Sequence, residues 1–188
     1  MKMTLKKLKQ DFSPLLDEEG NRLIPVSIRE EDSILSPFSP KGRPTISGEF
    51  AEFLDSQYTD MKSKEKLHID IECDTIDDKE EILYEGAIRS YYKAEEKRKT
   101  KELVRNNVIA LIMLLTGIVV LTVSVVFFIL SHEIIGEIID IVAWVFVWES
   151  VDLFFMRRPQ LLSEIIRCRH FAESKITYSV TEKQQDVA

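Results

Sequence analysis

Residues 108–130, VIALIMLLTGIVVLTVSVVFFIL, decide how this chain is organised, because none of these 23 residues is charged. About 20 apolar residues in a helix are enough to cross the hydrocarbon core of a bilayer. The alternative is a buried helix of a soluble protein, but a soluble helix of this length normally shows a polar face. We therefore predict that residues 108–130 form a transmembrane helix.

A second apolar stretch, residues 134–156, follows after a short segment at residues 131–133. Its middle, IVAWVFVW, is uncharged, and its acidic residues lie toward the two ends, at Glu137, Asp140, Glu149 and Asp152. A carboxylate at the bilayer centre costs about 2.5–3.5 kcal/mol, so acids near the ends are easier to accommodate. This pattern predicts a second span, joined to the first by an external turn at residues 131–133. A re-entrant or interfacial helix is the alternative.

Basic residues flank this predicted hairpin on both sides and are absent from its turn. They are Lys93, Lys97, Arg98, Lys99, Lys101 and Arg105 before the first stretch, and Arg157, Arg158, Arg167 and Arg169 after the second. Positive residues favour the cytoplasmic side, so we expect a multi-pass protein of the plasma membrane with both termini in the cytoplasm. The first 30 residues have a basic start without an apolar core, so no cleaved signal peptide is expected.

A small α+β module is predicted for residues 1–78. Residues 67–73, LHIDIEC, alternate strictly between apolar and polar side chains, which indicates a strand. Residues 15–28 predict a hairpin, with Pro25 on an edge strand because proline has no N–H to donate. Ser47 is a suitable helix N-cap. After it, one helix face is expected to carry Phe50, Phe53, Leu54 and Tyr58.

The remaining segments complete the predicted architecture. A cytoplasmic helix, residues 79–107, contains no proline and is expected to continue into the first span as one rod from about Lys79 to Leu130. Residues 157–176 predict a basic amphipathic helix that lies on the membrane or packs on the rod. Residues 177–188 are expected to be disordered. The predicted fold class is therefore α+β, a two-span helical hairpin carrying an N-terminal module and a C-terminal amphipathic helix.

Five charged residues form the candidate site of the predicted membrane part: Arg105, Glu149, Asp152, Arg157 and Arg158. Glu149 and Asp152 are three residues apart and share a helix flank. One interpretation is structural, with the arginines neutralising the two acids at the membrane boundary and setting the register of the helices. The other is a ring of carboxylates that attracts cations in an oligomer.

Two resemblances extend this interpretation. Trp148, Glu149 and Asp152 follow a Trp-acid-x-x-acid pattern that resembles the filter of the mitochondrial calcium uniporter family. In that family the motif opens the second span and includes a proline, whereas here it closes the span without one. Residues 144–159, WVFVWESVDLFFMRRP, together with residues 36–54, resemble small two-span bacterial membrane proteins. This second resemblance implies a bacterial membrane protein and no particular activity.

The sequence contains no P-loop, dinucleotide-binding glycine turn, HExxH or GxSxG motif, so we expect no enzyme activity and no bound cofactor or metal. Cys73 and Cys168 are predicted to be reduced thiols, and the net charge of −7 argues against nucleic acid as a partner. The hypothesis favoured by these observations is a membrane adaptor or accessory subunit that binds a protein or ligand, or assembles through its spans. A membrane-disrupting effector and a small cation channel are the alternatives.

Overall fold

The computed structural model describes residues 15–28, 34–40, 42–58, 65–73, 75–130 and 133–180, and the chain divides into two compact units. Unit 1 consists of the described residues within Met1–Ala94 and Arg167–Ala188, and unit 2 is Glu95–Ile166. In chain order the elements are β1 (Arg22–Ile28), α2 (Gly48–Gln57), β2 (Leu67–Cys73), α3 (Asp78–Ile129), α4 (Glu133–Asp152), η2 (Leu153–Arg157), α5 (Arg158–Ala172) and β3 (Lys175–Val180).

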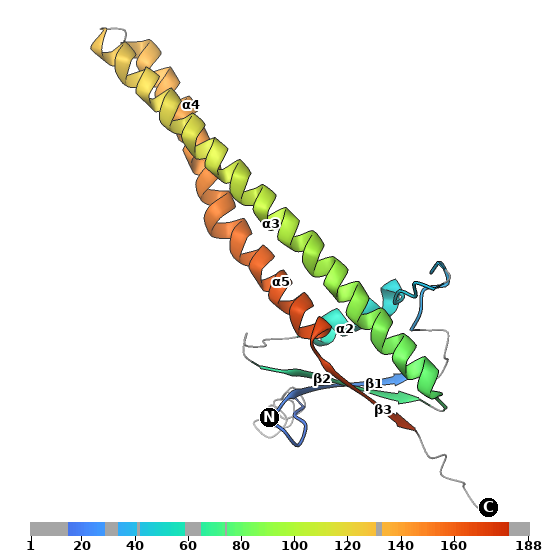
Figure 1. The fold of residues 1–188 in the computed structure, drawn as a ribbon. Coiled ribbons are helices and arrows are strands. Elements are labelled where there is room, and N and C mark those ends of the chain that lie inside the picture. The colour runs from blue at the N-terminus through green and yellow to red at the C-terminus, as the bar shows by residue number, and fades with distance from the viewer. Residues whose placement is uncertain are drawn as a thin grey trace, which may run out of the picture. The chain divides into compact units, whose positions relative to one another are not determined.

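A three-stranded parallel sheet in the order β1-β2-β3 forms the base of unit 1 (Figure 1). Ile24, Ile69 and Ile176 lie in register across the three strands, on the face that packs into the core. The prediction of a strand at residues 67–73 is confirmed, and its apolar side chains are buried as the alternation requires. Pro25 lies on an edge strand, also as predicted.

Helices cover the apolar face of this sheet. Ser47 caps α2 by accepting a hydrogen bond from the backbone N–H of Phe50 at 3.2 Å, which confirms the predicted helix start. Phe50 and Leu54 are buried, but Phe53 is half exposed because its position falls at the edge of the buried helix face. From the other two helices, Tyr92 of α3 stacks on Phe171 of α5 at a ring-centroid distance of 4.5 Å.

Two features of unit 1 differ from the prediction. Residues 15–23 make the predicted turn with a short antiparallel pairing, in which the Leu23 N–H donates to the Leu15 carbonyl at 2.8 Å, but β1 itself pairs in parallel with β2. The sheet is also completed by β3, although residues 177–188 were expected to be disordered. Ile176 and Tyr178 explain this strand, because both pack against the core and the Tyr178 hydroxyl donates to the Glu81 carbonyl at 3.1 Å.

The long helix predicted from about Lys79 to Leu130 is confirmed as α3, which has 52 residues. Glu80 supports its start, because its carboxylate accepts a hydrogen bond from the backbone N–H of Asp77 at 3.1 Å. Among the described helices, α3 is the one that is long and apolar enough to cross a membrane.

The predicted two-span hairpin is wrong in its second span. Only residues 141–148 of α4 form an uninterrupted uncharged run, with Asp140 before it and Glu149 after it. A run of this length rises about 12 Å in a helix, against the 30 Å or so of a bilayer core. The charge-free length of α3 has no counterpart in α4, and the described helices therefore offer one candidate span.

A π-helical turn, η2, joins α4 to α5. The backbone N–H of Arg158 donates to the Leu153 carbonyl, five residues back, instead of the usual four. Pro159 follows directly and accounts for this widening, because its ring clashes with the carbonyl four residues earlier and it has no N–H to donate. The helix expected at residues 157–176 corresponds to α5 in part, since α5 ends at Ala172 and β3 follows.

Candidate functional site

The contact between α3 and α4 in unit 2 is made by small residues spaced seven apart on both helices. On α3 these are Ala110, Gly117 and Ser124, and on α4 they are Gly136, Ala143 and Ser150. All six are buried. A seven-residue period keeps one side of each helix against its neighbour, and small side chains allow the two backbones to approach closely.

Two glycines show how close this approach is. A methyl group added at Gly117 would lie 2.9 Å from a side-chain carbon of Val147. One added at Gly136 would lie 2.9 Å from the ring of Phe128. Contacts this short force a neighbour to move, so a side chain at either glycine would displace Val147 or Phe128.

Three side chains hydrogen-bond across the pair to backbone carbonyls of the facing helical segment. The Ser124 hydroxyl donates to Gly136 at 2.9 Å, and the Ser150 hydroxyl donates to Ala110 at 2.9 Å. The Asn106 amide donates to the Leu153 carbonyl at 3.0 Å, at the start of η2. These three donors are buried, so their polar groups lie inside the contact between the helices.

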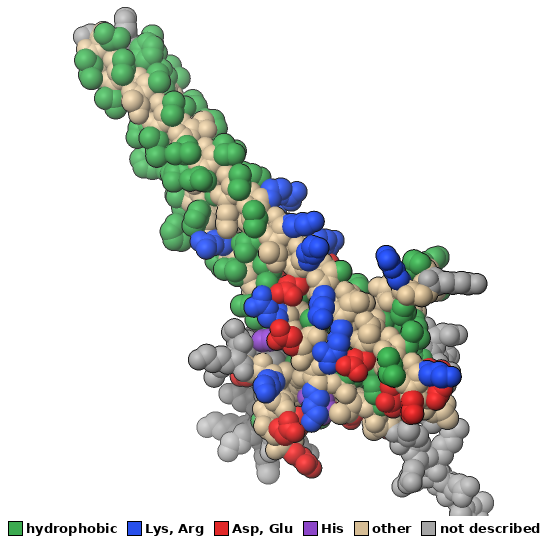
Figure 2. All heavy atoms as spheres, viewed as in Figure 1, with side chains coloured by type: hydrophobic (Ala, Val, Ile, Leu, Met, Phe, Trp, Pro, Cys, Tyr) green, Lys and Arg blue, Asp and Glu red, His purple; other side chains and the backbone are tan. Residues whose placement is uncertain are grey.

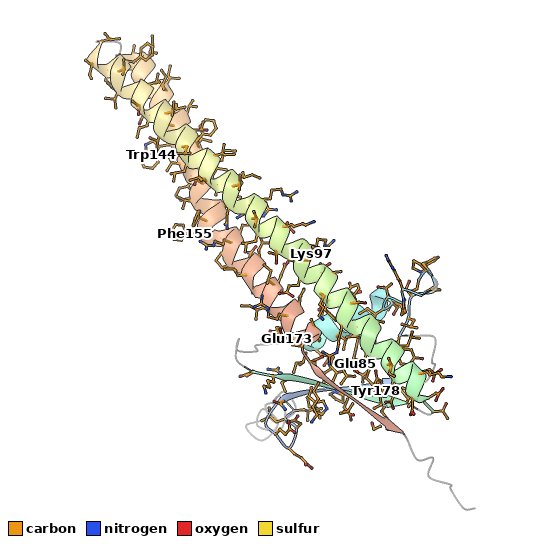
Figure 3. All side chains as sticks on the ribbon, viewed as in Figure 1. Glu85, Lys97, Trp144, Phe155, Glu173 and Tyr178 are labelled. Carbon is orange, nitrogen blue, oxygen red and sulfur yellow. The ribbon has the colours of Figure 1, made fainter. Side chains whose placement is uncertain are left out.

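The outer surface of this helix pair is made of large apolar side chains. Trp148 is 71% exposed, and Trp144 and Phe155 project away from the pair (Figure 3). Figure 2 shows this apolar surface continuing along unit 2 on the face drawn. Other exposed members are Ile112, Leu115, Val119, Val125 and Ile129 on α3, and Ile134, Ile138, Ile141 and Val145 on α4.

The charged residues proposed from the sequence as one cluster lie at the surface or make contacts with other groups. Arg105, Glu149 and Asp152 are exposed, and among the described residues no ion pair joins Arg105 to either acid. Arg157 instead lies 3.8 Å from Glu102, measured between its terminal nitrogen and a carboxylate oxygen. Glu102 lies on α3, one helical turn before Arg105.

The other basic residues near this end of unit 2 also have partners of their own. The guanidinium of Arg158 lies over the ring of Phe154, 5.2 Å from its centroid, at a distance where cation–π attraction operates. Lys99 of α3 pairs with Glu164 of α5, and this hydrogen bond raises the pKa of the Lys99 ammonium. These contacts tie α3 to the segment that follows α4.

A polar network lies on the face of the unit 1 sheet opposite to the helices. His68 of β2 contacts the Asp17 carboxylate through Nδ1 and the Thr177 hydroxyl through Nε2, both at 2.9 Å. The Thr177 hydroxyl donates to the Asp70 carboxylate at 2.7 Å. No sequence pattern indicates this network, because Asp17 and Thr177 lie 51 and 109 residues from His68 along the chain.

The direction of the hydrogen bonds limits what this network does chemically. An acid, an imidazole and a hydroxyl in a row also form the nucleophilic triad of many hydrolases. In a triad the imidazole accepts the hydroxyl proton, but the Thr177 proton is already directed to Asp70. The Thr177 hydroxyl therefore joins β3 to Asp70 of β2 beside the His68 ring.

Asp17 is strongly held at the end of this network. Burial raises the pKa of its carboxyl, but the side-chain and backbone hydrogen bonds from Asn21, the contact with His68 and the backbone N–H of Glu19 outweigh it and lower the pKa to about 2. The carboxylate thus joins the turn before β1 to the central strand. Among the described residues, no group of three or more His, Cys, Asp or Glu side chains comes together to hold a metal.

Comparison of the chain with models of protein families, with curated proteins and with solved structures finds no match in any of the three.

Proposed function

We propose that the protein is a non-enzymatic membrane adaptor, in which α3 anchors the chain in a bilayer and unit 1 binds a partner. The observation that supports this most directly is the distribution of side chains in unit 2. Small and polar residues form the interior of the helix pair, and large apolar residues form its exterior. Along residues 108–129 of α3 this distribution suits a hydrocarbon environment, where burying a large apolar side chain against protein gains nothing over exposing it to lipid.

The same surface is unfavourable in water. Leaving one large aliphatic or aromatic side chain exposed forgoes about 1.5–3 kcal/mol relative to burying it. Apolar residues repeat along the outer face of both helices, and contiguous patches of this kind are uncommon on soluble monomers. A lipid bilayer removes this cost along the uncharged residues 108–129 of α3.

The basic residues of α3 that precede this apolar segment support a cytoplasmic location for unit 1. Six of them lie between Lys93 and Arg105, and lysine and arginine next to a span favour the cytoplasmic side. The Thr177 hydroxyl of the polar network in unit 1 donates to the Asp70 carboxylate, an arrangement that suits a structural role better than an activated nucleophile.

Matched arginine substitutions test the anchoring role. Val119 is 62% exposed in the middle of the apolar segment, and Ile82 is 73% exposed in unit 1. If α3 lies in a bilayer, Val119→Arg costs about 2.5–3.5 kcal/mol on insertion and Ile82→Arg costs nothing there. The measurement is the fraction of full-length protein that stays in bacterial membranes after an alkaline carbonate wash.

We expect the wild type and Ile82→Arg to stay in the membrane and Val119→Arg to be partly lost from it. Release of the wild type by carbonate, or equal retention of the two variants, would overturn the anchoring role.

A further inference from the structure

A groove of about 490 Å³ lies in unit 1 between a loop and the first turns of α3. Arg43 and Pro44 line it on the loop side, and Lys79, Ile82, Leu83 and Gly86 line it on α3. Its volume is within the range of sites that bind small molecules or a few side chains of a peptide.

The loop side of the groove is held in place by its own hydrogen bonds. The Ser36 N–H donates to the Thr45 carbonyl at 2.9 Å, and the Thr45 N–H donates to the Ser39 hydroxyl at 3.0 Å. The Arg43 N–H donates to the Pro40 carbonyl at 3.0 Å. The groove is therefore preformed, which lowers the entropy lost when a partner binds.

Packing within unit 1 does not explain two residues on the α3 side of the groove, Ile82 and Gly86. Ile82 is exposed although the opposite side of the helix, including Ala87 and Ile88, is fully buried. Gly86 stands inside a helix, where glycine costs up to about 1 kcal/mol relative to alanine. No atom lies within 4 Å of where its Cβ would be, so packing does not require glycine here, in contrast to Gly117.

The charged side chains in the described lining of the groove are all basic. Lys79 and Arg43 are the charged residues of its described lining, and both are exposed and basic in a chain with a net charge of −7. Lys79 also lies in the first turn of α3, where the helix dipole disfavours a cation. Local features that oppose the fold are expected where a site has another use.

We propose that this groove docks a peptide segment of a protein partner that carries bulky apolar side chains next to acidic ones. The apolar side chain enters the space left open above Gly86, against Ile82 and Leu83, and its acidic neighbour pairs with Lys79 or Arg43. Because the groove is concave, it accommodates a protruding peptide side chain better than the flat surface of a lipid bilayer. This inference rests on the adaptor role of unit 1 proposed above and names the partner's chemistry.

Peptide selection on the intact protein tests this assignment. The full chain is placed in nanodiscs of neutral phosphatidylcholine, and random 12-residue peptides displayed on phage are selected against it, with empty nanodiscs as the background. Affinities of the enriched peptides are then measured by fluorescence anisotropy for the wild type and three variants. Gly86→Leu fills the groove, Lys79→Glu reverses its charge, and Gly48→Ala is the control, because Gly48 also has open space around it but lies outside the groove.

We expect enriched peptides to combine apolar and acidic residues. Gly86→Leu and Lys79→Glu should each weaken binding by about tenfold or more, equivalent to about 1.4 kcal/mol, while Gly48→Ala leaves it unchanged. Gly86→Leu should also keep or raise the melting temperature of unit 1, which separates blocked binding from unfolding. No enrichment over empty nanodiscs, or equal binding to Gly86→Leu, would overturn the proposal.

Lipid binding is a separate outcome of the same design. If the Gly86 and Lys79 variants lose binding to anionic vesicles instead of peptides, the groove is assigned to lipid and the peptide proposal is wrong. Membrane anchoring is measured independently by carbonate washing, so a failure here leaves the anchoring result intact.

Discussion

The two units of this chain place their side chains in opposite ways. Unit 1 buries large apolar residues such as Ile69, Leu54 and Phe171, and charged side chains gather on its surface (Figure 2). Unit 2 buries Ala110, Ala143 and Ser124 and exposes isoleucine, valine and tryptophan. The hydrophobic effect rewards the first arrangement in water, and close packing with hydrogen bonding rewards the second in hydrocarbon. The difference supports the proposed anchoring of α3 in a bilayer.

The aromatic residues allow each unit to be followed in the intact protein. All five tyrosines, Tyr58, Tyr84, Tyr91, Tyr92 and Tyr178, lie in unit 1. Both tryptophans, Trp144 and Trp148, lie in unit 2. Near-ultraviolet circular dichroism of tyrosine and fluorescence of tryptophan therefore report the two units separately.

The largest effect is expected for Ile69→Asp in unit 1. Ile69 is 0% exposed, and an unpaired charge at such a position costs more than about 4 kcal/mol, a large share of the stability of a small domain. We expect loss of the tyrosine signal and rapid proteolysis of unit 1, with little change in tryptophan fluorescence.

Ile82→Asp is the control for this change, because Ile82 is exposed in the same unit. It should leave the tyrosine signal intact. A stably folded Ile69→Asp protein would show that the buried face of β2 is assigned wrongly.

A smaller effect is expected for Gly117→Leu in unit 2. Because a Cβ at Gly117 would lie 2.9 Å from Val147, the side chain must separate the helices, at a cost of about 1–3 kcal/mol. Thermal unfolding in detergent, followed by tryptophan fluorescence, should show a lower midpoint for this variant.

Gly86→Leu, on the same helix, is the matched control because the space around Gly86 is open. An unchanged tryptophan transition in Gly117→Leu would mean that α3 and α4 do not pack closely in solution, and the contrast between the units would then be lost.

Sequence patterns predicted the parts of the fold that depend on near neighbours. The strand at Leu67–Cys73, the cap at Ser47 and the length of α3 each follow from residues within a few turns of one another. The strand β3 could not be predicted in this way. Its six residues are stabilised by pairing with β2, which lies about a hundred residues earlier in the chain.

The candidate site was only partly accessible from sequence. The seven-residue spacing of small residues in both helices is visible in the sequence and is the signal that predicts their contact. The interpretation that Arg105, Arg157 and Arg158 neutralise Glu149 and Asp152 depends on the register of two helices and stays a prediction. In the structure Glu102, one turn earlier on α3, pairs with Arg157.

The smallest effect expected is a pH dependence confined to unit 1, through Asp17. Its pKa in the folded protein is about 2, below the ordinary value of 3.8, so the folded state holds the proton less tightly than the unfolded state. The stabilisation by Asp17 is therefore fully present above pH 3.8 and is lost as the pH falls from there toward 2. Denaturant unfolding followed by the tyrosine signal should show this loss in the wild type. Asp17→Asn should be less stable at neutral pH, and its difference from the wild type should shrink in acid.

Glu18→Gln removes one acid from the same turn at an exposed position, and it should keep the acid-side loss of the wild type. A difference between wild type and Asp17→Asn that stays constant from pH 6 to pH 2 would show that the carboxylate does not hold the turn to His68.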